Sequence, residues 1–331
     1  MKPLVFISLL LIVTGLDSCG LGGSGFGRAT GAAYEVIVVM SKDAWESNAG
    51  AAVREELTAP VPYLLNAESS MSYQHALPDQ LSGFLRFIRN ILVVTIDKRM
   101  YTKVSLLRED NKWATGQLIL YLNAPDAQSV ETYLSENQRV LVNYFNKEEM
   151  KRTADFLREN YSPTVLEKVR DRFGISIYAP FDIKSFNETN ENVLWFTNNA
   201  KIGQMHLLVY TFPYVDTNTF TLDYLVAKRD SIAKLVVPGA HPGSYMTTEK
   251  RVVDYFATTL NGKYCGVLRG LWRMEGDMMG GPFVSFARVD EPNRRVIVTE
   301  GFVYEPNKDK RNYIRRIEAA LYTTRFADEL N

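Results

Sequence analysis

Two loops of the chain carry side chains whose types could perform acid–base or nucleophilic chemistry. Residues 237–244, VPGAHPGS, place His241 three positions before Ser244, so this loop could present a general base and a nucleophile. A later glycine-rich loop holds Glu275 and Asp277, two carboxylates of the kind that glycosidases use as a pair. The sequence therefore offers these four side chains as catalytic candidates of an envelope hydrolase.

Each of these patterns also has an interpretation without catalysis. Proline and glycine mark ordinary tight connections after a helix. No GxSxG nucleophile elbow surrounds the serine, and a loop does not fix the separation of two carboxylates. We therefore take a non-enzymatic binding or assembly module as the leading hypothesis and the hydrolase as its alternative. Capture of a small ligand between the two halves of the chain is a third possibility, which needs only a pocket at their junction.

The glycine-rich loop, residues 270–283, also has the composition of a contact surface. It contains Trp272, Met278 and Met279, and aromatic residues and methionine are enriched at the centres of interfaces. A loop that packs into its own core would have the same composition. The interaction hypothesis predicts an exposed apolar patch at these three residues and an envelope protein as the partner.

Metal and cofactor chemistry have little support. The chain has three histidines, His75, His206 and His241. They form no HxxxH or HExxH pair, and Cys265 lies in an apolar strand pattern typical of a packed thiol. Glycines at positions 20, 22 and 25 spell GxGxxG, but a dinucleotide site needs this motif between a strand and a helix. We predict no metal and no cofactor.

Composition and charge limit the class of partner. The chain is 46% hydrophobic and 12% aromatic, which is enough for a substantial core. Lys and Arg number 38, as do Asp and Glu, so the formal net charge is zero. A nucleic-acid binding protein needs a basic surplus to displace counterions. We therefore predict that the chain binds no nucleic acid.

The first residues are typical of an export signal. Lys2 precedes an apolar run over residues 4–13, which is too short to cross a bilayer core of about 30 Å. Leu16 then stands three residues before Cys19, with the small Ser18 just before the cysteine, as in a lipobox. We predict a signal peptide over residues 1–18 and lipid on Cys19, including an acyl chain such as palmitate.

Two features of this region qualify the prediction. Asp17 departs from the small residue usual at its position, and an ordinary signal peptidase could instead cut after Gly20. Leu21, two residues after the cysteine, favours the outer membrane with the protein facing the periplasm. Residues 19–33 are glycine-rich and predict a flexible tether between lipid and folded body.

The rest of the chain repeats one series of elements. Apolar runs at residues 91–96, 103–108 and 116–122 predict three strands, which lie close together as antiparallel neighbours do. A long helical pattern then extends, with breaks, from about residue 125 to 172. The pattern predicts an α+β fold of antiparallel sheets with packed helices. We expect two units, related in element order, at residues 34–160 and 161–331.

These features together resemble a family of bacterial envelope lipoproteins, domain of unknown function 4837, typical of the Bacteroidota. The resemblance rests on the short signal with its lipid cysteine, the early strand and helix, the segment GLWRMEGDMMGGPFVS and the terminal helix. It covers nearly the whole mature chain. It implies a location in the envelope and implies no catalytic residue.

Overall fold

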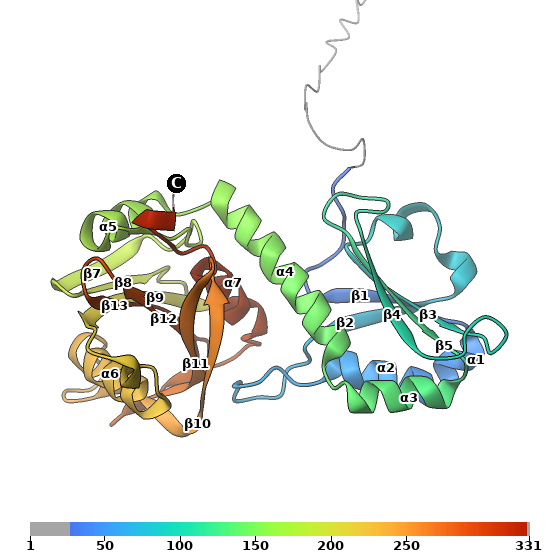
Figure 1. The fold of residues 1–331 in the computed structure, drawn as a ribbon. Helices are drawn as coiled ribbons and strands as arrows, with labels where there is room; N and C mark the ends of the chain where they lie inside the picture. The colour runs from blue at the N-terminus through green and yellow to red at the C-terminus, as the bar shows by residue number, and fades with distance from the viewer. Residues whose placement is uncertain (1–26, 330–331) are drawn as a thin grey trace, which may run out of the picture.

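The computed structural model describes residues 27–329, which form two α+β domains (Figure 1). Helix α4 (Val140–Glu159) ends the first domain, and α5 (Pro163–Phe173) begins the second. The α+β class expected from the sequence is confirmed. Within residues 27–329, none of the helices combines the length and apolar character needed to cross a membrane.

The first sheet has five strands in the order β2-β1-β3-β5-β4. These are β1 (Glu35–Val39), β2 (Ser72–Ala76), β3 (Asn90–Ile96), β4 (Ser105–Asp110) and β5 (Leu118–Ala124). The β1–β2, β1–β3 and β3–β5 pairs are parallel, and β4 is antiparallel to β5. The prediction of antiparallel neighbours is therefore wrong for β3 and β5, because β4 lies at the sheet edge and β5 inserts between β3 and β4.

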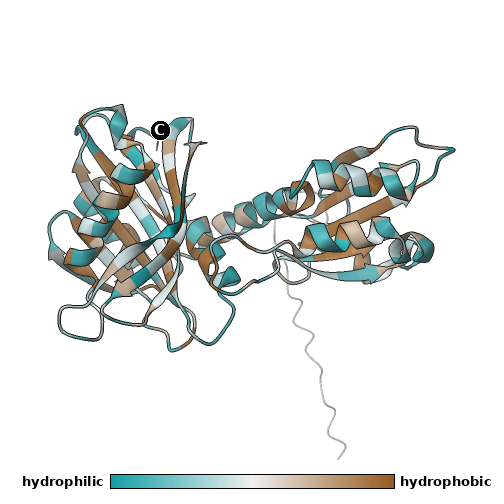
Figure 2. Cartoon of the chain, turned by 90° about the horizontal axis from the view of Figure 1, so that it is seen from below, coloured by the Kyte–Doolittle hydropathy of each residue, from teal (hydrophilic) through white to brown (hydrophobic). Residues whose placement is uncertain are grey.

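Alternating apolar side chains give this sheet two buried faces. Val36 and Val38 of β1 point to the face that the long helices cover, and Ile37 and Val39 point to the opposite face. The helices are α1 (Lys42–Glu46), α2 (Asn48–Thr58), α3 (Ala127–Glu136) and α4, and the short 3-10 turns are η1 (Pro78–Gln80) and η2 (Gly83–Phe87). Leu85 of η2 packs on the second face. Figure 2 shows the apolar strands between their helices.

The second sheet has seven strands in the order β10-β11-β12-β13-β9-β8-β7, all antiparallel. They are β7 (Ser185–Asn190), β8 (Val193–Thr197), β9 (Gln204–Pro213), β10 (Tyr245–Leu260), β11 (Lys263–Glu275), β12 (Gly280–Asp290) and β13 (Arg295–Tyr304). The strands β6 (Ile175–Ser176) and β14 (Arg325–Phe326) form a separate pair, and the 3-10 turns η3 (Thr217–Thr219) and η4 (Ala327–Glu329) complete the domain. The two domains therefore differ in strand direction and strand order.

Helices cover both faces of the second sheet. α5 and α7 (Arg311–Leu321) pack on one face, and α6 (Leu222–Val236) packs on the other. A buried ion pair attaches α6 to its sheet, because Arg229 Nη2 lies 2.7 Å from Glu300 Oε1. The same guanidinium donates to Thr248 Oγ1 and lies 3.8 Å from the ring centre of Phe283. The guanidinium of Arg229 is thus enclosed by an ion pair, a hydrogen bond and an aromatic ring, which compensate its burial.

The N-terminal segment is attached to the first domain over part of the predicted tether. Arg28 and Thr30 form parallel bridges with Thr115 and Ile88. Thr30 N donates to the carbonyl of Phe87 at 2.8 Å. The last residues of the predicted tether, residues 19–33, are therefore bound to the folded domain and do not act as a tether. Its earlier part lies outside the described residues.

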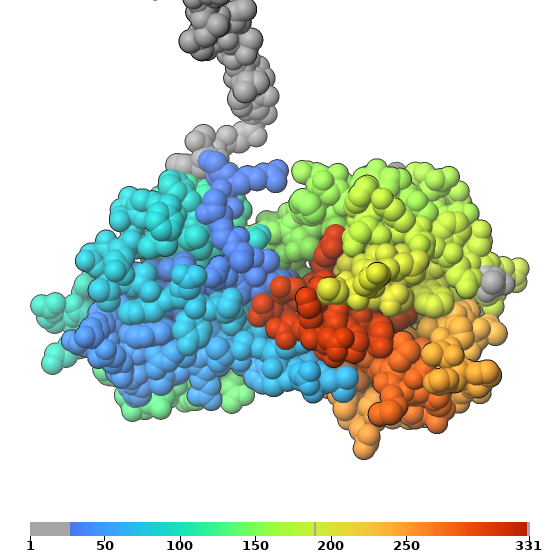
Figure 3. All heavy atoms as spheres, turned by 180° about the vertical axis from the view of Figure 1, so that it is seen from behind, coloured from blue at the N-terminus to red at the C-terminus, as the bar shows by residue number. Residues whose placement is uncertain are grey.

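One loop of the first domain reaches across to the second. We call residues 59–70, between α2 and β2, the interdomain loop. Helix α7 has no side-chain cap of its own, and Glu68 takes that role, because its two oxygens accept from Lys310 N and Arg311 N at 2.8 Å each. Arg315 Nη1 donates to Ser70 O at 2.9 Å, and the contact of this blue loop with the red helix is visible in Figure 3.

His206 makes the stability of the second domain depend on pH. Its ring is buried in β9, accepts from Trp195 Nε1 at 3.1 Å and stacks on Phe302. Burial lowers the pKa of His206 from 6.5 to about 3. Between these values the unfolded chain binds the extra proton, so stability falls as pH falls.

We expect the unfolding free energy to decrease by about 2 kcal/mol between pH 7 and pH 5 because of this one group. The His206→Gln chain keeps an acceptor for Trp195 and should lose that part of the pH dependence. Denaturant unfolding of both chains at the two pH values measures the difference. Parallel pH profiles would contradict the assignment.

Removing the shared helix cap should weaken the attachment of the two domains. Glu68→Ala leaves two backbone N–H groups of α7 without their acceptor, and we expect a loss of about 1–2 kcal/mol in unfolding free energy. Glu68→Gln should lose less, because an amide oxygen still accepts one bond. Glu55→Ala, an exposed glutamate on α2, is the control and should change stability by less than about 0.5 kcal/mol.

Candidate functional site

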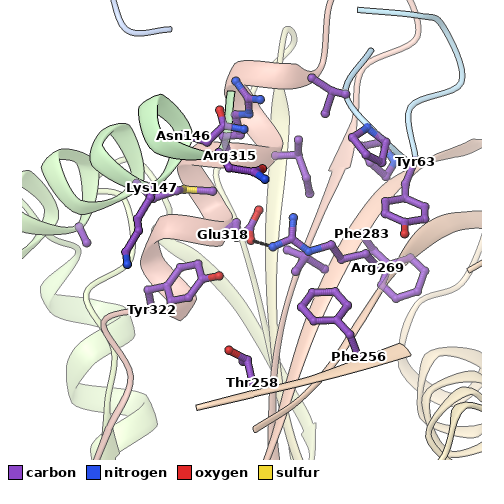
Figure 4. A pocket seen from close by; sticks show the side chains of 18 of the residues that line it. Tyr63, Asn146, Lys147, Phe256, Thr258, Arg269, Phe283, Arg315, Glu318 and Tyr322 are labelled. Atoms are coloured by element: carbon purple, nitrogen blue, oxygen red, sulfur yellow. Dashed lines mark hydrogen bonds and ion pairs between the residues drawn. The ribbon is translucent and has the colours of Figure 1, made fainter. Parts of the chain in front are cut away.

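A cavity of about 780 Å³ lies where the two domains meet, and we call it the interdomain cleft. The interdomain loop, one face of α4, strands β10 to β12 and α7 form its walls (Figure 4). Tyr63, at the tip of the loop, closes one side because its hydroxyl donates to Asp254 of β10 at 2.7 Å. The main chain of Tyr63 has a φ of 62°, a left-handed conformation that this tight tip requires.

The wall formed by α4 is cationic. Lys147 and Lys151 are one helical turn apart, and Arg158 lies further along the same wall. Both lysines are exposed, and neither has an ion-pair partner within residues 27–329. Arg158 pairs with Asp155 at 2.6 Å. The two lysines therefore present positive charge to the cleft without a neutralising carboxylate.

The wall formed by α7 and β11 holds buried charges. The Glu318 carboxylate binds the guanidinium of Arg269, as the dashed line in Figure 4 shows. Burial raises the pKa of Glu318, while Arg269 and Arg315 oppose this rise. Arg315 lies 4.2 Å from the ring centre of Tyr34, and burial lowers the pKa of Arg315 to about 10. Both cations stay protonated at neutral pH.

Two polar atoms in these walls are buried without a hydrogen-bond partner among the described residues. They are Oδ1 of Asn146, an acceptor, and Nε of Arg269, a donor. Buried polar atoms in proteins are nearly always paired. Both residues line the cleft, but these two atoms are themselves buried in its walls.

Apolar side chains complete the lining. They include Val61, Leu64, Met150, Phe256, Val284 and Ile314. The described lining residues contain six Lys or Arg side chains and one carboxylate, Glu318. An apolar wall beside an excess of positive charge suits a small anionic molecule with an apolar body. No histidine, cysteine or serine is among the described residues that line the cleft.

The structure brings the two loops with the catalytic candidates together, outside this cleft. Ser244 Oγ donates to His241 O at 2.6 Å and accepts from His241 N, so the hydroxyl is used within its own turn. Asp277 Oδ2 accepts from Ala240 N at 3.1 Å. Glu275 pairs with Arg273 of the same strand at 2.8 Å. Ser244 and Asp277 thus stabilise the loops, Glu275 forms an ion pair within β11, and His241 contributes main-chain atoms only. None of the four residues lines the cleft.

The residues of the predicted contact surface divide between core and surface. Trp272 is 2% exposed, and its Nε1 donates to Val303 O at 3.2 Å. Met279 is partly buried against the same core, whereas Met278 is fully exposed. Trp272 is therefore unavailable to a partner. Side chains alternate between the two faces of the sheet along β11, and the side chain of Trp272 lies on the face that α6 covers.

The other sequence predictions concern cysteines and metals. Cys265 is a buried free thiol, and burial raises its pKa to about 12, as expected for a packed residue. Cys19 and the GxGxxG glycines lie outside the described residues. Residues 27–329 contain no group of three or more His, Cys, Asp or Glu that could hold a metal ion.

The fold and cleft define a two-domain α+β protein with a cationic cavity at the domain junction. Residues 162–323, which make up most of the second domain, match the model described as Domain of unknown function (DUF4837). Residues 29–158 match a second one, Domain of unknown function (DUF8532). No curated protein matches the chain. The family resemblance inferred from the sequence is confirmed for residues 162–323. Its expected extent over nearly the whole mature chain is wrong, because residues 29–158 match a different model. The lipoprotein type stays a prediction.

The sequence analysis did not find the cleft. A partial signal exists in α4, where Asn143, Lys147 and Lys151 recur every four residues beside the apolar stripe. Such a row is normally a solvated helix face. Only the tertiary structure shows that Arg269 and Arg315, more than a hundred residues away in the chain, face the same space.

The buried carboxylate at the cleft wall should be essential for stability. Glu318→Gln leaves Arg269 and Arg315 close together without their shared counter-charge, and we expect a loss of roughly 3 kcal/mol. Phosphate should restore part of the thermal stability relative to chloride at equal ionic strength, because an anion can replace the carboxylate. Glu188→Gln, which removes a half-exposed partner of Lys168 and Arg172, is the control and should show neither effect.

Proposed function

We propose that the chain is a lipid-anchored envelope protein that binds a small organic anion in the interdomain cleft. The observation that carries this proposal is the charge of the cleft lining, six cationic side chains and one carboxylate. The cleft volume of about 780 Å³ is in the range of small-molecule sites and well below what a folded partner needs. The protein is therefore a binding module whose ligand is an envelope component.

The arrangement of charge in the cleft supports an anionic ligand over a neutral one. Glu318 already neutralises Arg269, so the charge available to a ligand comes mainly from Lys147 and Lys151 on the opposite wall. Arg269 is held by Glu318, and its Nε is buried in the wall. An acidic group in the cleft would therefore meet mainly the mobile ammonium groups of the two lysines.

The apolar residues define the rest of the ligand. Phe256 and Val284 lie on the strand side of the cleft, and Met150 faces them from α4. A polar ligand such as a sugar phosphate would place its hydroxyl groups against these apolar side chains, where they would find no hydrogen-bond partners. We therefore expect an acid with an aliphatic or aromatic body, sized to fill the cavity.

The N-terminal residues support the proposed location of the protein. The signal peptide, the lipobox ending at Cys19 and Leu21 favour an anchor in the outer membrane with the folded domains in the periplasm. A cleft for a small amphiphilic anion fits that compartment, where such molecules are components of the envelope.

Charge reversal on α4 tests the proposed site with a probe of the same chemistry. The dye 1-anilinonaphthalene-8-sulfonate combines aromatic rings with one sulfonate. We expect the Lys147→Glu/Lys151→Glu chain to bind this dye about tenfold more weakly, measured by fluorescence titration. The neutral dye N-phenyl-1-naphthylamine lacks the sulfonate and should bind both chains equally.

The matched control reverses two lysines elsewhere. Lys98→Glu/Lys103→Glu makes the same change in net charge on exposed residues of the first domain that do not line the cleft. This chain should bind the anionic dye with unchanged affinity. Equal weakening in both double variants would show an effect of overall charge and refute the cleft as the binding site.

A further inference from the structure

The short 3-10 turn η2 exposes two aromatic side chains. Phe84 is 77% exposed and Phe87 is 44% exposed, although phenylalanine normally lies inside a domain. The turn itself is firmly held, because Leu85 packs on the first sheet and Gln117 Nε2 donates to the carbonyls of Arg86 and Ile88. Two apolar rings are therefore presented to the outside on a rigid support.

The same turn receives the N-terminal segment of the chain. The Phe87 carbonyl accepts from Thr30 N at 2.8 Å, and Arg89 N donates to Thr30 O at 2.8 Å. Gly31 lies against the Ile88 side chain, and a Cβ there would be 3.5 Å from it. The chain thus joins the folded domain next to η2.

The distance from this point to the proposed lipid anchor is short. Nine residues lead from Cys19 to Arg28, so the two are at most about 30 Å apart even in a fully extended chain. The turn is therefore confined near the bilayer surface, and confinement of this kind makes even a weak contact favourable.

The charges around the turn do not supply the attraction. Arg28 is paired with Glu159 at 3.9 Å, and Lys112 with Glu109 at 2.8 Å. The Arg86 guanidinium lies over the ring of Trp113 at 5.7 Å. Two of these three cations are thus paired with carboxylates, and contact with lipid would rest mainly on the two phenylalanine rings.

We propose that η2 docks on the lipid bilayer, inserting Phe84 and Phe87 into its interface beside the anchored N-terminus. This inference rests on the lipid anchor of the proposed function and is independent of the cleft. Docking fixes the first domain against the membrane and carries the second domain and the interdomain cleft at a set orientation to it.

A depth measurement on the full, lipidated chain tests the proposal. Phe84→Cys is labelled with bimane, and the chain is reconstituted into vesicles of phosphatidylethanolamine and phosphatidylglycerol that contain brominated lipid. Val215→Cys, equally exposed at 77% in the second domain, is the matched control. The unsubstituted lipidated chain is the labelling blank, because its remaining thiol, Cys265, is buried.

We expect bromines near the headgroup, at the depth of about 5–10 Å that interfacial side chains reach, to quench the Phe84→Cys probe and not the Val215→Cys probe. Quenching should be unchanged by added salt. A Phe84→Cys probe that stays unquenched on a chain that floats with the vesicles would overturn the docking and leave the anchor intact. A chain that does not float would overturn the anchor and the docking together, without affecting dye binding in the cleft. Shielding of the probe in native membranes but not in lipid vesicles would mean that a protein covers the turn, which also overturns lipid docking.

Discussion

A carboxylate from one domain completes a helix of the other. Glu68 satisfies two backbone N–H groups at the start of α7, which has no side-chain cap of its own, and a neighbouring carbonyl receives Arg315. Helix α7 also packs directly on α4, where Leu157, Ala319 and Ala320 form one buried cluster, and the two helices form adjoining walls of the cleft. The geometry of the site therefore depends on this helix packing together with the cap from the other domain. A parallel case exists inside the first domain, where Glu56 accepts from backbone N–H groups at the start of α4.

The protein uses charge in two distinct ways. Arg229 is surrounded by Glu300, Thr248 and the Phe283 ring, so its charge is fully compensated and serves only to attach α6. Around the cleft the compensation is incomplete, since one carboxylate stands among six cations. Because isolated charges are costly to bury, most of this excess lies at the rim, on exposed lysines, and only the paired Arg269 and the stacked Arg315 lie deeper. The excess positive charge of the lining therefore costs little folding free energy without a ligand, and the cleft still attracts anions.

Local sequence patterns foretold the class of fold but not the site. Strands such as Arg295–Tyr304 and the long helix α4 follow from apolar periodicity, which acts over a few residues. The parallel pairing of β3 with β5 escaped prediction because insertion of one strand between two others leaves no local signature. Trp272 was expected at a surface because aromatic residues are enriched at interfaces, but the pleat of β11 buries it. The cleft joins residues from α4, β11 and α7, and no spacing in the sequence records that meeting.

Neither domain encloses the cleft by itself. The interdomain loop and α4 come from the part of the chain that matches one family model, and the strands and α7 come from the part that matches the other. Natural selection on the ligand would therefore act on both parts at once, and a lineage that separated or exchanged one of them would lose the cavity while keeping two foldable units. Residues that contact each other across the junction, for example Glu68 and the start of α7, should therefore have changed together during evolution.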